Sequence, residues 1–170
     1  MGEILDKAYN LLKTLPEEDQ ERIAWEIIER VEDKTEWDKI VATPDSQHWL
    51  GIHAKMALKE YKKISKKLSL TFISMPLDNL LREESYWKHF DELPSELRTL
   101  AEKNYRLWKE NPHHPGLRFK KIHTELPVFS FRVGMRYRTV GVETRDGKIV
   151  WFWIGSFDHF KESICPGGSS

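Results

Sequence analysis

Four short runs of strand-forming residues, separated by turn signals, constrain the fold of this 170-residue chain more than any other feature. Gly134-Met135 marks one turn, and Arg145-Asp146-Gly147 marks another that is typical of a β-hairpin. Short connections join antiparallel neighbours, so the runs predict a small antiparallel meander. The predicted strands are Leu117–Ile122, Val128–Val133, Arg136–Val142 and Lys148–Ile154.

Two helical segments precede these strands. Apolar residues at helical spacing predict helices over Glu84–Phe90 and Pro94–Trp108, and a proline-rich loop follows at Asn111–Gly116. Two helices followed by a meander indicate an α+β fold, with these helices packed on one face of the sheet. We expect this domain to span residues 76–164, with a flexible tail at 165–170.

The first part of the chain is predicted to be helical. It ends in Leu68–Ser74, where alternating apolar and polar residues predict a strand. Met75-Pro76 follows, and the composition changes there, so we place a domain boundary near Ser74 and treat residues 1–74 as a separate segment. The predicted helices are Glu3–Leu15, a helix opened by Pro16, a short stretch around Trp37–Val41, and a helix from about Gln47 to Ile64.

The net charge of zero conceals two blocks of opposite sign. Residues 1–45 hold six Lys/Arg and thirteen Asp/Glu, a net charge of −7, and residues 103–138 hold nine and two, a net charge of +7. Such blocks either face each other or serve different partners, unless both are simply solvated surfaces.

The sequence also predicts a soluble, cytoplasmic protein without a membrane partner. It contains one cysteine, no apolar run that could cross a bilayer and no signal peptide.

The basic block is the candidate binding site. On the predicted strands, Arg118 and Lys120 point to one face, with Phe119 and Lys121 on the other. The following strands add Arg132, and then Arg136 and Arg138 with Tyr137 between them. Clustered cations with an aromatic residue favour binding of RNA through its phosphates and bases. A solvated basic face, or pairing with the acidic block of the same chain, are the alternatives.

The second half of the chain resembles the RelE/ParE superfamily of bacterial toxins in the order and spacing of its motifs. The residues that carry the resemblance are Leu93-Pro94, Ala101, Tyr105-Arg106-Leu107, Asn111-Pro112, His114-Pro115, Leu117–His123, Arg132-Val133, Tyr137-Arg138 and Val150–Ser156. The resemblance implies a small antiparallel sheet flanked by two helices. It also implies a metal-free endoribonuclease that cuts mRNA, often on the ribosome, or a gyrase inhibitor of the ParE type.

Cleavage of RNA without a metal needs cations at the phosphate and groups that transfer protons. Arg118, Lys120, Arg136 and Arg138 suit the first role, and His123 or Lys121 suits the second. No histidine spacing matches a zinc ligand set, so neither a metal nor another cofactor is expected.

The sequence departs from the family at its C-terminal end. Related toxins often carry a histidine after Gly-Ser/Thr, where this chain has Phe157, and phenylalanine cannot transfer a proton. His159, two positions further on, is a second candidate.

We therefore expect a fused antitoxin–toxin chain, in which residues 1–74 resemble an antitoxin and cover the basic face of residues 76–164. The expected partners are mRNA, the ribosome and the chain's own first segment, and the sequence also allows a homo-oligomer. A catalytically inactive toxin-like domain that binds RNA or a protein, and gyrase inhibition, stay open as alternatives.

Overall fold

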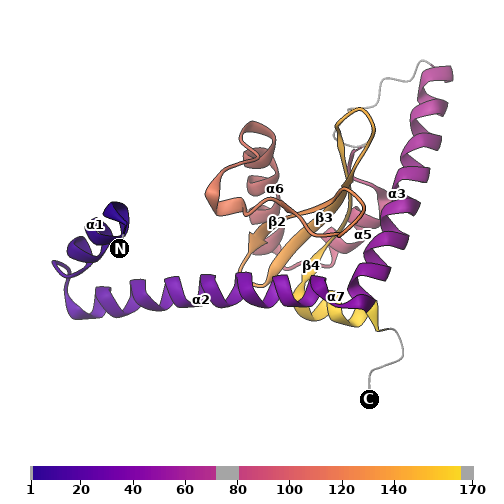
Figure 1. Cartoon of the computed structure of the whole chain (residues 1–170). Helices are drawn as coiled ribbons and strands as arrows, with labels where there is room; N and C mark the ends of the chain where they lie inside the picture. Colours follow the sequence, from indigo (N-terminus) through magenta and orange to yellow (C-terminus); the bar gives the residue numbers. More distant parts are fainter. Residues whose placement is uncertain (1, 72–80, 166–170) are drawn as a thin grey trace. The chain divides into compact units, whose positions relative to one another are not determined.

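The computed structural model describes residues 2–71 and 81–165 (Figure 1). The chain divides into two compact units, Met1–Glu36 and Trp37–Ser170. Helices combine with one four-stranded antiparallel sheet, so the predicted α+β class is confirmed.

The first unit contains α1 (Glu3–Leu12) and the first part of α2 (Glu17–Ala42). The carbonyl of Pro16 accepts hydrogen bonds from the amides of Asp19 and Gln20, so this proline opens α2 as predicted. The helix then runs without a break to Ala42, and the separate short stretch predicted around Trp37 is its last part.

The second unit is built on the predicted meander, with strand order β1-β2-β3-β4. Each strand pairs antiparallel with the next, as the short turns require. The strands are β1 (Lys120–Lys121), β2 (Val128–Gly134), β3 (Tyr137–Glu143) and β4 (Ile149–Ser156).

The first predicted strand, Leu117–Ile122, is confirmed only in its second half, because Lys120 and Lys121 form β1 and the Ile122 amide donates a hydrogen bond to the Val128 carbonyl of β2. A 3₁₀ turn, η1 (Pro115–Leu117), precedes them, and the next residue, Arg118, has a φ of 48°. That left-handed conformation bends the chain away from a strand path, so the pairing begins two residues later.

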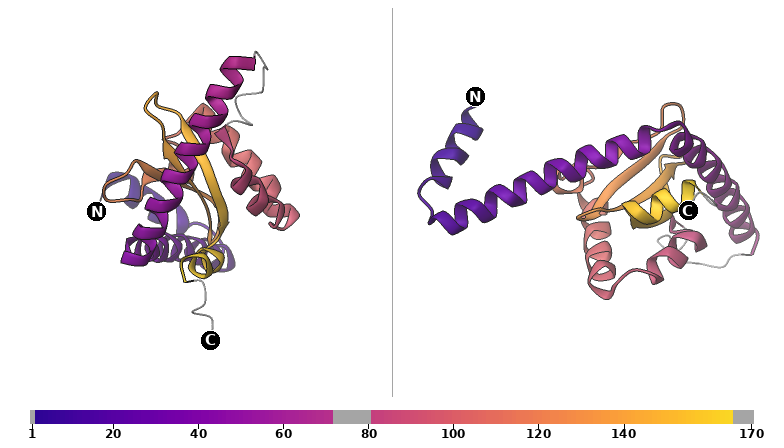
Figure 2. Two further views of the ribbon diagram at one scale, coloured as in Figure 1. Left: turned by 90° about the vertical axis from the view of Figure 1, so that its right-hand side faces the viewer. Right: turned by 90° about the horizontal axis from the view of Figure 1, so that it is seen from below.

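Helices pack on both faces of the sheet (Figures 1 and 2), and the two helices predicted before the meander share one face, which confirms that prediction. On one face lie α5 (Glu84–Asp91) and α6 (Ser95–Glu110). On the other lie the end of α2, α3 (Pro44–Thr71) and α7 (Phe157–Ile164). Strand β4 reads IVWFWIGS and is buried on both sides, which explains why it lacks the alternation of a half-exposed strand.

Two predictions at the end of the first segment need correction or fall outside the structure. Residues Leu68–Thr71, predicted as a strand, continue α3 as a helix. Extending an existing helix by one residue fixes only that residue, whereas a new strand needs a partner, so the helix is the easier continuation. Residues 72–74 and the predicted boundary near Ser74 lie outside the described residues.

Helix α7 was not predicted. It begins directly after β4, where the Ser156 hydroxyl accepts a hydrogen bond from the His159 amide at 3.1 Å, as an N-cap does. This helix carries Phe157 and Phe160 into the core, and both side chains are fully buried. The residues that resemble a catalytic motif therefore form the first turn of a core helix.

Candidate nucleic-acid interface

One end of the sheet carries cations that are distant from one another in the sequence. Arg132 lies directly opposite Arg138, and Lys120 lies directly opposite Ser130. Residues opposite each other, or two apart on one strand, point to the same side of a sheet, so these three cations share a face. It is the face covered by the end of α2, because Ser130 contacts Trp37.

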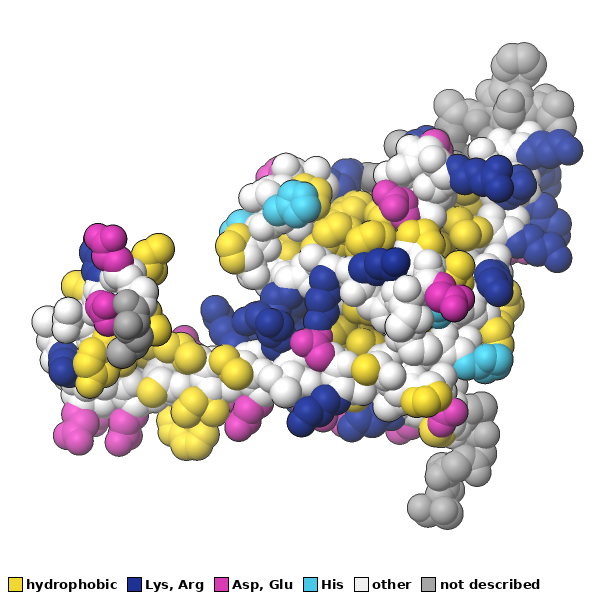
Figure 3. Space-filling view, in the orientation of Figure 1, with side chains coloured by type: hydrophobic (Ala, Val, Ile, Leu, Met, Phe, Trp, Pro, Cys, Tyr) yellow, Lys and Arg dark blue, Asp and Glu magenta, His cyan; other side chains and the backbone are white. Residues whose placement is uncertain are grey.

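Arg136 joins this group from the turn between β2 and β3, where its φ is 61°. The guanidinium carbons of Arg136 and Arg138 lie 5.1 and 5.0 Å from the centre of the Phe157 ring. Figure 3 shows Lys and Arg side chains gathered in this region, near the end of β2. We name Lys120, Arg132, Arg136 and Arg138 the basic cluster.

The end of α2 brings an aromatic ring to the basic cluster. Trp37 is 1% exposed, and its indole nitrogen donates a hydrogen bond to the Ser130 hydroxyl at 3.1 Å. Its ring stacks on Phe157 with centroids 5.2 Å apart and an interplanar angle of 20°. The guanidinium carbon of Arg138 lies 5.8 Å from the Trp37 ring centre. A cation, an indole and a phenyl ring therefore contact one another in the interior.

Asp38, the next residue of α2, forms an ion pair with Lys120. These side chains keep 41% and 35% of their exposure, so the pair lies at the surface. A phosphate that approached Lys120 would have to compete with this carboxylate. Trp37 and Asp38 thus present to the cations the two kinds of group, a ring and an anion, that RNA offers as base and phosphate.

Arg138 is buried, with 2% of its surface exposed. Its guanidinium donates hydrogen bonds to the carbonyls of Tyr137 and Gly134 at 3.0 and 3.4 Å. A guanidinium removed from water needs such acceptors and rings, because its desolvation is costly. In the observed conformation Arg138 is therefore compensated by backbone carbonyls and rings and does not reach the surface.

Tyr137 lies on the opposite face from the basic cluster. It packs at the edge of the core formed by α5 and α6. The sequence placed it between Arg136 and Arg138 as a ring for stacking a base, but neighbours on a strand point to opposite faces. Phe157 is the ring that lies between these arginines.

The predicted placement of Arg118 and Lys121 relative to Lys120 is confirmed only in part. Arg118 follows the 3₁₀ turn in a left-handed conformation, so it does not share a strand face with Lys120 as predicted. Lys121 is exposed and lies opposite Phe129, on the other side of the sheet from Lys120. The predicted separation of Lys120 from Lys121 is thus confirmed.

His123 uses both ring nitrogens within the fold. Nδ1 accepts hydrogen bonds from the amides of Glu125 and Leu126 at 3.1 and 2.9 Å, so Nε2 carries the proton in the neutral ring. Nε2 lies 3.0 Å from the carbonyl oxygen of Gln47 and donates to it. The ring therefore joins the loop after β1 to α3, which accounts for this histidine without a catalytic role.

The two candidate positions at the C-terminal end lie on different sides of α7. Phe157 is fully buried against Trp37, whereas His159 is turned by about 200° around the helix. The Nε2 atom of His159 lies 3.3 Å from Nδ1 of His89 in α5. Burial is the main cause that lowers the pKa of His89 below its ordinary value, and the neighbouring His159 lowers this pKa further. His159 therefore belongs to a second cluster and not to the basic one.

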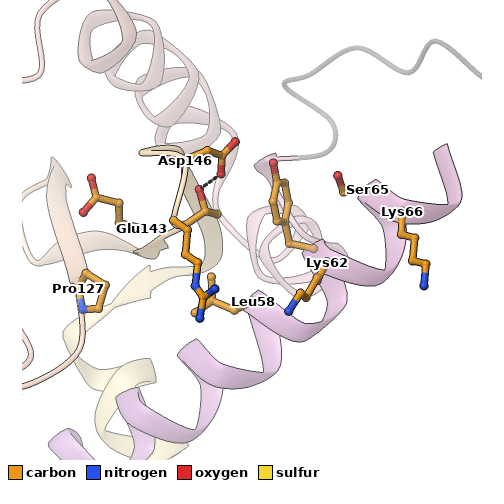
Figure 4. Close-up of a pocket in the computed structure, with 10 residues that line it drawn as sticks. Leu58, Lys62, Ser65, Lys66, Pro127, Glu143 and Asp146 are labelled. Atoms are coloured by element: carbon orange, nitrogen blue, oxygen red, sulfur yellow. Dashed lines mark hydrogen bonds between the residues drawn. The ribbon is translucent and has the colours of Figure 1, made fainter. Parts of the chain in front are cut away.

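A groove of about 830 Å³ lies between α3 and the β3–β4 hairpin (Figure 4). Lys62 and Lys66 come from α3, and Arg145 and Asp146 come from the hairpin. The Asp146 carboxylate accepts a hydrogen bond from the Thr144 hydroxyl and is 3.3 Å from Lys148, so it stabilises the hairpin.

Comparison of the chain with protein-family models, with curated proteins and with solved structures gave no match. Within residues 2–71 and 81–165, no helix combines the length and the apolar character needed to cross a membrane.

Trp37 and Asp38 are the site residues that the sequence did not indicate. Trp37 was recognised only as an apolar helix residue, and Asp38 only as one charge of the acidic block. Their contacts with Ser130, Arg138 and Lys120 join positions more than eighty residues apart. The spacing of neighbouring residues in the sequence does not indicate such long-range contacts.

Proposed function

We propose that the chain is a cytoplasmic, fused antitoxin–toxin protein whose basic cluster binds RNA and is covered by its own N-terminal region. The resemblance to RelE-like toxins suggests the toxin half. One observation carries the proposal, namely that Trp37 and Asp38 lie on the basic cluster. A binding face that is occupied by the same chain matches the expected relation of antitoxin to toxin.

The charge arrangement supports this proposal physically. Like charges on neighbouring strands repel one another, and Arg132 directly opposite Arg138 is such a pair. Folding keeps these cations together only if anions, rings or carbonyls compensate their charge. Here the compensation includes Asp38 and the rings of Trp37 and Phe157, and RNA phosphates would supply it once α2 moved away.

The first prediction tests whether Asp38 competes with RNA. Asp38→Asn in the full chain should increase affinity for a single-stranded RNA by up to about fivefold, since exposed ion pairs are worth roughly 0.2–1 kcal/mol. The measurement is a fluorescence anisotropy titration of labelled RNA at two or more salt concentrations. The slope of log affinity against log salt should become steeper by about one ion, because the Asp38 carboxylate no longer competes with a phosphate at Lys120.

Glu110→Gln is the matched control, because it removes the same charge from an exposed position in α6. It should raise affinity much less than Asp38→Asn does. Lys120→Met combined with Asp38→Asn should cancel the gain. Equal effects of the two single substitutions would mean that only net charge matters and that α2 does not cover an RNA site.

A second candidate function is an RNA-binding toxin-like domain that does not cleave RNA. Two observations favour it, the burial of Phe157 at the position of the family's histidine and the three hydrogen bonds of His123. Neither residue is placed to transfer a proton to RNA. Incubating the Asp38→Asn chain with mRNA, on and off ribosomes, distinguishes the candidates: specific cleavage supports the toxin, and binding without cleavage supports the inactive domain.

A further inference from the structure

Two histidines and a glutamate converge beside β4, away from the basic cluster. His89 and Glu92 are three residues apart at the end of α5, so they lie on one side of that helix. His159 reaches them from α7. One ligand atom from each of the three side chains lies within 4.8 Å of the others.

The distances are compatible with a shared metal ion. His89 Nδ1 and His159 Nε2 are 3.3 Å apart, at the long end of the range for a hydrogen bond. Two nitrogens bound at about 2.0–2.1 Å to a tetrahedral zinc ion are themselves about 3.3 Å apart. The Glu92 carboxylate oxygen is 3.9 Å from His89 Nδ1, and its side chain is 57% exposed, so it can move closer without disturbing the core.

The surroundings also favour ligation. The ring of Trp153 lies 6.2 Å from that of His89 and 6.1 Å from that of His159, and it forms an apolar wall beside both. Such a wall orients the ligands and limits access of water.

We propose that His89, Glu92 and His159 form a binding site for a zinc-like divalent cation, independent of the proposed RNA-binding function. Two imidazoles and one carboxylate match the donors of zinc sites that keep a fourth position open. The ion would link α5 on one face of the sheet to α7 on the other. The sequence did not indicate this site, because His159 lies seventy residues from its nearest ligand partner in space.

The experiment titrates the metal-free full chain with Zn²⁺ by calorimetry and with Co²⁺ by visible absorption. All chains should carry Cys165→Ser, because this exposed thiol could bind zinc itself. We expect one ion per chain, Co²⁺ bands typical of tetrahedral coordination, and a melting temperature that rises with metal concentration. Glu92→Gln and His159→Ala should each weaken binding by more than about tenfold, since even outer-shell changes cost 10–100-fold.

His113→Ala is the matched control, because this exposed histidine lies in the loop before η1. It should leave affinity and metal-dependent melting unchanged. Glu92→Gln removes only an exposed carboxylate and should preserve the fold, so its result stands even if His159→Ala destabilises the chain. The proposal is wrong if the chain binds no ion, or if neither Glu92→Gln nor His159→Ala weakens the binding.

Discussion

The imidazole of His123 illustrates how a histidine beside a run of cations can serve the fold. Its partners are two amides in its own loop and the carbonyl of Gln47, which is 76 residues away in the sequence. The local pattern Lys-Lys-Ile-His allowed a proton-transfer role, and only the approach of α3 decides between the two roles. Chemistry at the residue scale therefore depends on long-range packing.

We predict that His123→Ala reduces the free energy of unfolding by about 1–3 kcal/mol, because polar groups in a partly buried loop lose their partner. Urea denaturation followed by tryptophan fluorescence measures the change, and His113→Ala serves as the exposed control. RNA affinity should change little in the folded protein. If His123→Ala instead preserved stability and abolished an RNA cleavage activity, the catalytic role would be restored.

At the scale of elements, the meander, α5 and α6 could be predicted from the sequence, because turn residues and apolar spacing are local signals. Helix α7 carried such a signal in Ser156, which has the residue type of an N-cap. The resemblance to RelE-like toxins instead suggests Phe157 as the replacement of a catalytic histidine. The extension of α3 through Leu68–Thr71 could not be predicted, because the alternation there equally suits a strand.

Burial of Phe157 reverses the expectation for its replacement by histidine. From the family motif, Phe157→His should raise RNA cleavage if this position faces the substrate. In the structure the ring is fully buried between Trp37, Arg136 and Arg138. A histidine there would place a polar ring near two cations, so we predict a loss of about 2–4 kcal/mol, in the range for disrupted aromatic cores.

Thermal melting checks this prediction, with Phe157→Leu as the apolar control. Leucine keeps the site apolar and should cost less than histidine does. A Phe157→His chain as stable as the original, with increased cleavage of RNA, would contradict the packing argument and support the family's catalytic arrangement.

For the whole molecule, the sequence predicted a partner for the basic face and a boundary near Ser74, which lies outside the described residues. The second compact unit begins at Trp37, because the end of α2 and α3 supply Trp37, Leu50 and Ala54 to the core on one face of the sheet. Eleven of the thirteen acidic residues in positions 1–45 precede this unit. Within the second unit, the basic cluster is thus covered by the Trp37 indole and the Asp38 carboxylate, and not by most of the acidic block.

This division predicts different outcomes for two truncations. A chain of residues 37–170 should fold cooperatively, because it forms one compact unit with both cores. It should bind RNA no more tightly than the full chain, since Trp37 and Asp38 still lie on the basic cluster.

A chain of residues 75–170 lacks α3 and the end of α2, and should aggregate or unfold at a lower temperature, because an apolar sheet face is exposed to water. Growth on expression, melting temperature and RNA anisotropy measure these outcomes. If removing residues 1–36 alone released RNA binding or slowed growth, restraint would come from Met1–Glu36, and the role assigned to Trp37 and Asp38 would have to be abandoned.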